Sequence, residues 1–188
     1  MPALVNGLRP TMDLPMAFFG HSMGALLVFE LAREFRRQCL PGPVHLFISG
    51  YRAPHLSDPE EPLHTLPDDQ FVQELQRRYG ETEDFLQSPE LVELFLPLLR
   101  ADFSVCETYV YRQEEPLDCP ISAFGGSQDR KVTRQHLAAW RMHTRGSFSL
   151  RIFPGDHFYL RNAKVSLLQT LGQQLAQIVR RAPHRHVE

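Results

Sequence analysis

The chain has 188 residues, 43% of them hydrophobic and 22% charged, which suffices for one compact domain with its own core. Its 20 Lys and Arg residues balance 22 Asp and Glu residues, so the composition does not predict the strongly basic face of a nucleic-acid-binding protein. No apolar run approaches the roughly 20 residues of a membrane span. Three cysteines without CxxC spacing indicate neither a disulfide framework nor a zinc site, and the N-terminus lacks a signal-peptide pattern. We therefore expect a soluble cytoplasmic protein that binds neither nucleic acid nor membrane.

Apolar segments alternate with segments of helical periodicity, which is typical of an α/β domain with a mostly parallel sheet. We expect strands at 15–20, 44–49, 121–124 and 148–153, and helices at 23–37, 133–143 and 161–181. In the last helix we expect the buried stripe to comprise Leu168, Leu171, Leu175 and Ile178.

Residues 54–112 interrupt this alternation with a Pro- and acid-rich loop followed by helical periodicity. So long a connection exceeds what joining two parallel strands requires, so we interpret it as a helical lid over the carboxyl edge of the sheet. The alternative is that its helices simply cover one sheet face. On the lid interpretation, 1–53 and 113–188 form the core and 54–112 the insert. Two helical faces of the insert are apolar: Phe71, Leu75 and Tyr79 on one, and Leu91, Phe95, Leu98 and Leu99 on the other.

The segment Gly20-His21-Ser22-Met23-Gly24 matches GxSxG between a predicted strand and a predicted helix. A sharp turn there lifts the Ser22 hydroxyl clear of the backbone, and we expect both glycines to avoid collisions that a Cβ would cause. The helix N-terminus supplies the Met23 N–H where an oxyanion would form. Ser22 is therefore the candidate nucleophile; a structural turn serine is the alternative.

A serine nucleophile needs a base and an orienting acid, which follow it in the order acid, then histidine, in this architecture. Among nine histidines, only His157 is predicted in a loop between a strand and the final helix. His21 adjoins the nucleophile, but we expect it to be structural. Asp129 occupies the equivalent loop after the preceding strand, where it can accept a hydrogen bond from His157. Asp156 and Asp102 remain alternatives for the acid.

Six stretches in order, GHSMGA, LLVFELAR, LFISGYRAP, LPLLRADFSVCETYVY, FGGSQD and GDHFYL, resemble the type II thioesterases. The resemblance runs from about Leu14 to about Leu175 and implies an α/β-hydrolase fold. It also implies hydrolysis of acyl groups from the phosphopantetheine thiol of acyl or peptidyl carrier protein domains, as editing or chain release in polyketide, non-ribosomal peptide or fatty acid synthesis. By match to the motif, Ser22, Asp129 and His157 take the triad roles. No metal or organic cofactor is implied, and we expect a monomer.

Members of this family begin with a strand and a Gly-rich loop that supplies a second oxyanion N–H. No such segment precedes Leu14, so we expect the N-terminal strands to be missing. Losing one oxyanion donor costs roughly 10²–10³ in turnover, so the sequence leaves the activity of this chain open. Two other interpretations stay open: a carboxylesterase or acyltransferase of the same fold, and a truncated form that binds carrier proteins without catalysis.

The insert also offers candidates for the acyl-chain environment. These are its apolar residues Phe71, Leu75, Phe95, Leu98 and Leu99. Packing within the insert explains the same pattern equally well.

Overall fold

The sheet has four parallel strands whose order in space is their order along the chain. The computed structural model describes residues 1–79 and 88–181. The strands are β1 (Ala17–His21), β2 (His45–Ser49), β3 (Ile121–Gly126) and β4 (Phe148–Phe153). All four carboxyl ends therefore lie at one edge of the sheet. The predicted α/β class with a parallel sheet is confirmed.

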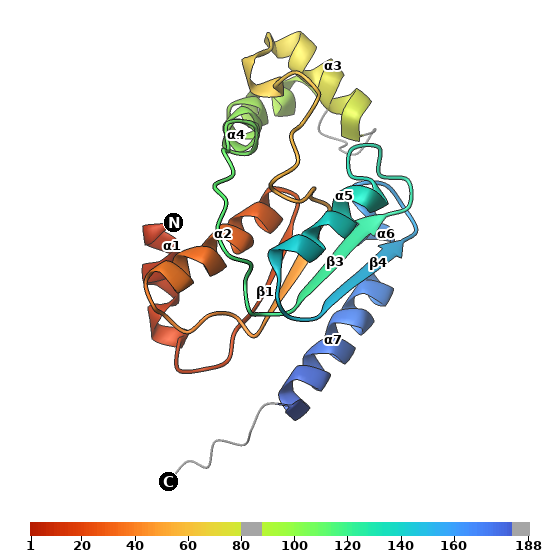
Figure 1. Cartoon of the computed structure of the whole chain (residues 1–188). Coiled ribbons are helices and arrows are strands. Elements are labelled where there is room, and N and C mark those ends of the chain that lie inside the picture. Colours follow the sequence, from red (N-terminus) through yellow and green to blue (C-terminus); the bar gives the residue numbers. More distant parts are fainter. Residues whose placement is uncertain (80–87, 182–188) are drawn as a thin grey trace.

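Helices cover both faces of this sheet (Figure 1). On one face lie α2 (Met23–Arg37) and α5 (Arg134–Ala138), the latter followed by the 3₁₀ turn η4 (Ala139–His143). On the other lie α6 (Tyr159–Asn162) and α7 (Lys164–Arg181). The central strands β2 and β3 are buried along their whole length. That burial explains their almost continuous apolar sequence, since a strand covered on both faces has no solvent side.

The predicted buried stripe of the last helix is right for Leu171 and Ile178 and wrong for Leu168 and Leu175. Leu167, Leu171 and Ile178 pack toward the sheet, whereas Leu168 is 56% exposed and Leu175 is 39% exposed. Leucines stand at both 167 and 168, so helical periodicity alone permits two adjacent stripes, and only packing against Phe47 and its neighbours decides between them.

A short helix and a 3₁₀ turn precede β1. They are α1 (Pro2–Leu8) and η1 (Arg9–Thr11). Val5 of α1 is buried against Leu31 and Phe35 of α2, so this segment adds to the apolar core on that face.

The region between β2 and β3 contains η2 (Leu63–Thr65), α3 (Asp68–Tyr79) and α4 (Pro89–Glu107). In Figure 1, α3 and α4 lie beyond the carboxyl ends of the strands. These elements have an apolar cluster of their own, with Leu63, Phe71, Leu75 and Leu96 at its centre. The insert thus packs as a unit at the edge where strand-end loops gather.

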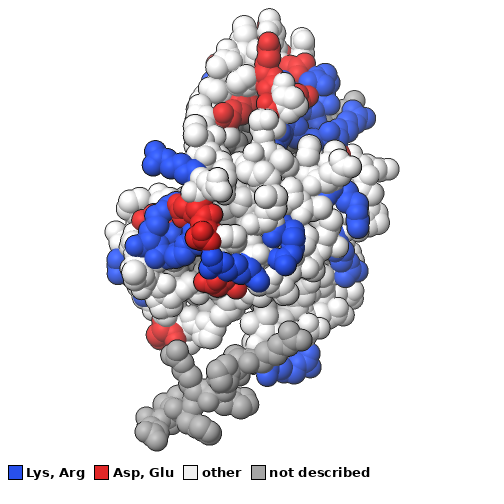
Figure 2. Space-filling model, in the orientation of Figure 1, with Lys and Arg blue, Asp and Glu red and all other residues white. Residues whose placement is uncertain are grey.

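Positive and negative side chains are interspersed on the face drawn in Figure 2, as the balanced composition predicts. Within residues 1–79 and 88–181, no helix is long and apolar enough to cross a membrane.

Candidate active site

Ser22 occupies a strained turn between β1 and α2. Its backbone has φ 53° and ψ −123°, a conformation that residues with a side chain rarely adopt. Two main-chain hydrogen bonds hold it: the Ser22 N–H donates to the Ser49 carbonyl at 2.8 Å, and the Ala25 N–H donates to the Ser22 carbonyl at 2.9 Å. Met23 is the first residue of α2, so its N–H has no acceptor within the helix.

The two motif glycines have different surroundings. A Cβ on Gly20 would lie 2.1 Å from the carbonyl oxygen of Gly24, so the turn requires glycine at position 20. A Cβ on Gly24 would meet nothing within 4 Å. The prediction that both glycines prevent a collision is therefore wrong for Gly24, which itself supplies the atom that Gly20 approaches.

Three loops at the carboxyl edge bring Ser22, Asp129 and His157 together. Nε2 of His157 lies 3.1 Å from Oγ of Ser22, and Nδ1 of His157 lies 2.9 Å from Oδ2 of Asp129. The side chains of His157 and Asp129 are 3% and 0% exposed. Because a carboxylate only accepts, Nδ1–H is the donor to Asp129, and a neutral ring then offers Nε2 as acceptor to the Ser22 hydroxyl.

The second oxygen of Asp129 is held by its own loop. Oδ1 accepts hydrogen bonds from the N–H groups of Lys131 and Val132, both at 2.9 Å. The carboxylate is thereby fixed in orientation as well as position. Of the two alternative acids, Asp156 is engaged elsewhere, since its Oδ1 accepts from the Phe158 N–H at 2.8 Å.

Within residues 1–79 and 88–181, three aromatic rings surround the His157 imidazole. The ring centroids of His21, Tyr79 and Phe158 lie 5.0, 5.0 and 5.1 Å from that of His157. His21 and Phe158 are the sequence neighbours of Ser22 and His157, whereas Tyr79 is the last residue of α3 in the insert. Nothing in the sequence distinguishes Tyr79 from other apolar residues of that helix.

His21 is itself a partly buried, neutral group. Its Nδ1 lies 2.8 Å from Oγ of Ser49, which in turn lies 2.5 Å from the Tyr159 hydroxyl. Burial lowers the pKa of His21 to about 3, and the neighbouring His157 acts in the same direction. The ring beside His157 therefore carries no charge at neutral pH.

A second Ser–His pair lies inside the sheet. Nε2 of His45 lies 2.8 Å from Oγ of Ser122, and these side chains are 8% and 1% exposed. Ser122 donates its hydroxyl hydrogen to Oε1 of Gln174 at 2.9 Å, so His45 acts as a donor toward it. Burial lowers the pKa of His45 to about 4. This pair is a buried polar contact beneath α7, without a turn that presents the hydroxyl.

The five apolar candidates of the insert fall into two groups. Phe71 and Leu75 are buried at the centre of the insert's own cluster, and Leu99 packs against it. Phe95 and Leu98 are 40% and 58% exposed on α4. The structure does not gather the five into one surface.

Metal ligands are not clustered in the described part of the chain: no three His, Cys, Asp or Glu side chains are placed to hold an ion.

The thioesterase domain family matches residues 3–175 of this sequence. The chain belongs to the type II thioesterases. It is 47% identical over 172 residues to the gramicidin S biosynthesis protein GrsT of Aneurinibacillus migulanus, covering 92% of this chain and 67% of that protein. The predicted family is thereby confirmed.

Two solved structures of this type extend the comparison to the fold. RedJ, a thioesterase from the prodiginine pathway of Streptomyces coelicolor, superposes with a TM-score of 0.84 at 39% identity, over 92% of this chain and 68% of that one. BorB, a type II thioesterase from the borrelidin biosynthetic cluster, superposes with a TM-score of 0.79 at 38% identity, over 93% and 72%. The chain spans 60–67% of the length of three curated relatives.

Proposed function

We propose that this chain is a serine thioesterase that hydrolyses acyl thioesters carried on the phosphopantetheine of acyl or peptidyl carrier proteins. The observation that carries the proposal is the position of His157, which lies within hydrogen-bonding distance of both Ser22 and Asp129. Membership of the thioesterase family supports the reaction class. The biosynthetic pathways in the names of GrsT, RedJ and BorB support the carrier-bound substrate.

In the proposed reaction, Nε2 of His157 takes the Ser22 proton as Oγ attacks the thioester carbonyl carbon. The Met23 N–H donates to the resulting oxyanion. The C–S bond then breaks, and protonated His157 gives its proton to the departing thiol, which leaves an acyl ester on Ser22. Water, deprotonated by the same imidazole, attacks this ester, and the acid is released with the proton returned to Oγ. Asp129 keeps Nδ1 protonated and stabilises the imidazolium in both steps.

The insert, 54–112, is proposed to act as a lid over this site, and its apolar residues to contribute to the acyl-chain environment. The position of α3 and α4 beyond the carboxyl ends of the strands supports this role (Figure 1). The protein would act on stalled or finished chains as a monomer that docks transiently with its carrier.

The test is mass spectrometry of the chain after brief exposure to an acyl-pantetheine thioester. We expect an acyl adduct on Ser22 and none on the Ser22→Ala variant, with hydrolysis of the thioester faster than that of the matched oxygen ester. An undiminished rate in Ser22→Ala, or an adduct on another residue, would refute the proposal. Faster cleavage of the oxygen ester would favour a carboxylesterase.

A further inference from the structure

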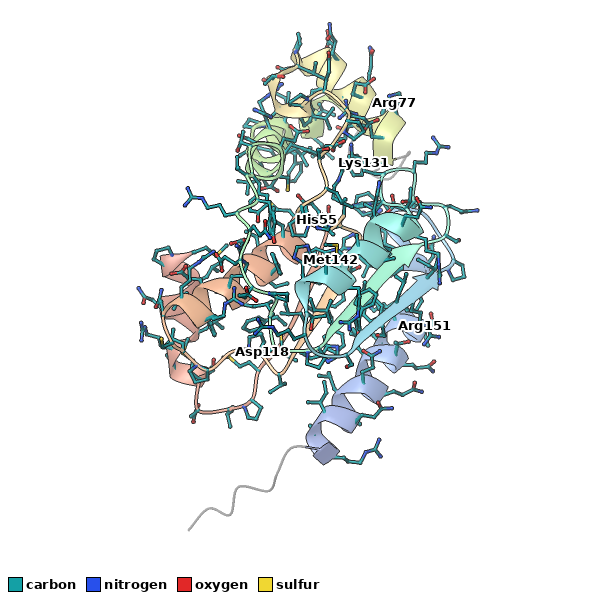
Figure 3. All side chains as sticks on the ribbon, in the orientation of Figure 1. His55, Arg77, Asp118, Lys131, Met142 and Arg151 are labelled. Atoms are coloured by element: carbon teal, nitrogen blue, oxygen red, sulfur yellow. The ribbon has the colours of Figure 1, made fainter. Side chains whose placement is uncertain are left out.

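Lys131 joins the loop of the proposed catalytic acid to the segment that leads into the insert. It lies two residues after Asp129, and its side chain is only 9% exposed. Its Nζ is 2.8 Å from Oδ2 of Asp58 and also forms an ion pair with Glu60. Figure 3 shows Lys131 on the side of this loop that faces α3, with Arg77 above it. One ammonium group thus connects the triad loop with the insert.

This ammonium group lies between two carboxylates that would otherwise repel each other. Burial acts to raise the pKa of Asp58 and of Glu60, but the bonds from Lys131 and other donors outweigh it, so both pKa values lie below their ordinary range. Arg52 pairs with Asp58 at 2.6 Å and Arg77 pairs with Glu60 at 3.0 Å. Acidic and basic side chains gather over α3 in Figure 2. Removing the charge at position 131 would leave the two carboxylates facing a neutral neighbour.

The ion pairs around Lys131 extend to the C-terminal end of α3, which lies against His157. Arg77, which pairs with Glu60, lies in the last turn of α3, two residues before Tyr79. The Tyr79 ring lies 5.0 Å from the His157 ring in an edge-on arrangement and 5.6 Å from Phe103 of α4. Two ion pairs, Lys131 with Glu60 and Glu60 with Arg77, therefore connect the loop of Asp129 to the last turn of α3, and the backbone of that turn carries the ring that lies against His157.

We propose that Lys131 is a positioning residue for the reaction: by fixing the entry of the insert, it sets the end of α3 so that Tyr79 holds the His157 ring in line with Ser22. The inference rests on the proposed function, because it assigns Lys131 a role in the alignment of that triad. Lys131 touches no reacting atom, and its effect passes through Tyr79.

The test is a double-mutant cycle in the full chain with Lys131→Met, Tyr79→Leu and the double variant, and with Lys131→Arg as the matched control. Two rates are measured well below each variant's unfolding midpoint: kcat on a short acyl-pantetheine, and covalent labelling of Ser22 by a fluorophosphonate. We expect Lys131→Met and Tyr79→Leu each to lower both rates about ten-fold with little change in KM. The double variant should be no slower than Tyr79→Leu, and Lys131→Arg should keep most of the activity.

The inference would be overturned if the rate loss of the double variant equalled the product of the two single-variant losses. Lys131 would then act independently of Tyr79. An unchanged kcat in Lys131→Met would overturn it as well, as would a loss that Lys131→Arg shares in full. Failure of the proposed function gives a different result: the unmodified chain would then either show no labelling of Ser22 or cleave the oxygen ester faster than the acyl-pantetheine.

Discussion

A Cβ on Gly126 would lie 2.0 Å from the carbonyl oxygen of Asp156, the residue before His157. The loop that carries Asp129 and the loop that carries His157 thus touch through their main chains at the ends of β3 and β4. A hydrogen bond also joins the two loops, since the Gln128 N–H donates to the Gly155 carbonyl at 2.8 Å. The separation of Asp129 and His157 is therefore set by backbone packing that a side chain at position 126 would prevent.

Gly126→Ala is accordingly expected to push these loops apart, since a new methyl group cannot remain 2.0 Å from an oxygen atom. A displacement on the order of 1 Å at a reacting group costs about 10²-fold in rate, so we expect a kcat loss of that order on acyl-pantetheine. Gly172→Ala is the matched control, because a Cβ there meets nothing within 4 Å. Similar kcat values for the two variants would contradict this account of the loop contact.

The second prediction separates Asp129 from its neighbour Asp156. Asp129→Asn keeps an oxygen for the Lys131 and Val132 N–H groups but loses the charge that holds the His157 tautomer, so we expect kcat to fall roughly 10³–10⁴-fold with the fold retained. Asp156→Asn keeps the acceptor for the Phe158 N–H and should stay within a few-fold of the unmodified chain. Steady-state kinetics and circular dichroism of the pair provide the check. If Asp156→Asn proved the more damaging change, the acid would be misassigned.

The third prediction concerns pH and three histidines whose protonation burial disfavours, His45, His143 and the His21 described above. Burial lowers the pKa of His45 and of His143 to about 4, and for His143 the neighbouring His55 adds to the effect. Below about pH 6.5 the unfolded chain therefore binds protons that the folded chain refuses. The free energy of unfolding therefore keeps its full value above that pH and declines as the pH falls toward 4. At pH 5 the loss is about 2 kcal/mol for each histidine.

Urea unfolding at pH 7.5, 6 and 5 measures this decline, in a range above the carboxylate titrations of Asp58 and Glu60. The variant His45→Gln, which keeps a donor for Ser122, should remove about one third of this decline, because three histidines contribute to it. A free energy of unfolding that stayed constant or rose between pH 7.5 and 5 would show that these histidines are not buried in neutral form.

The sequence predicts those features that follow from local pattern and sheet topology. Ser22 stands in a recognisable motif, and Asp129 and His157 each follow a strand; because parallel strands end at one edge, their proximity could be expected. The structure places His157 within hydrogen-bonding distance of both Ser22 and Asp129. Tyr79 and Lys131 could not be identified in this way, because their contacts join segments far apart in sequence and carry no periodic signal.

The last prediction uses the strained backbone of Ser22. At φ 53° and ψ −123° any residue with a Cβ is destabilised, by about 1–3 kcal/mol, whereas glycine adopts the conformation freely. Ser22→Ala and Ser22→Gly both remove the hydroxyl and its contact with His157, so the difference between them isolates the backbone strain. Glycine also loses more conformational entropy on folding, roughly 0.5–1 kcal/mol. We therefore expect the free energy of unfolding of Ser22→Gly to exceed that of Ser22→Ala by about 1 kcal/mol, measured by urea unfolding. Both variants should be inactive. Equal or lower stability of the glycine variant would mean that the turn holds Ser22 without strain, and that the backbone geometry of Ser22 does not lower the stability of the fold.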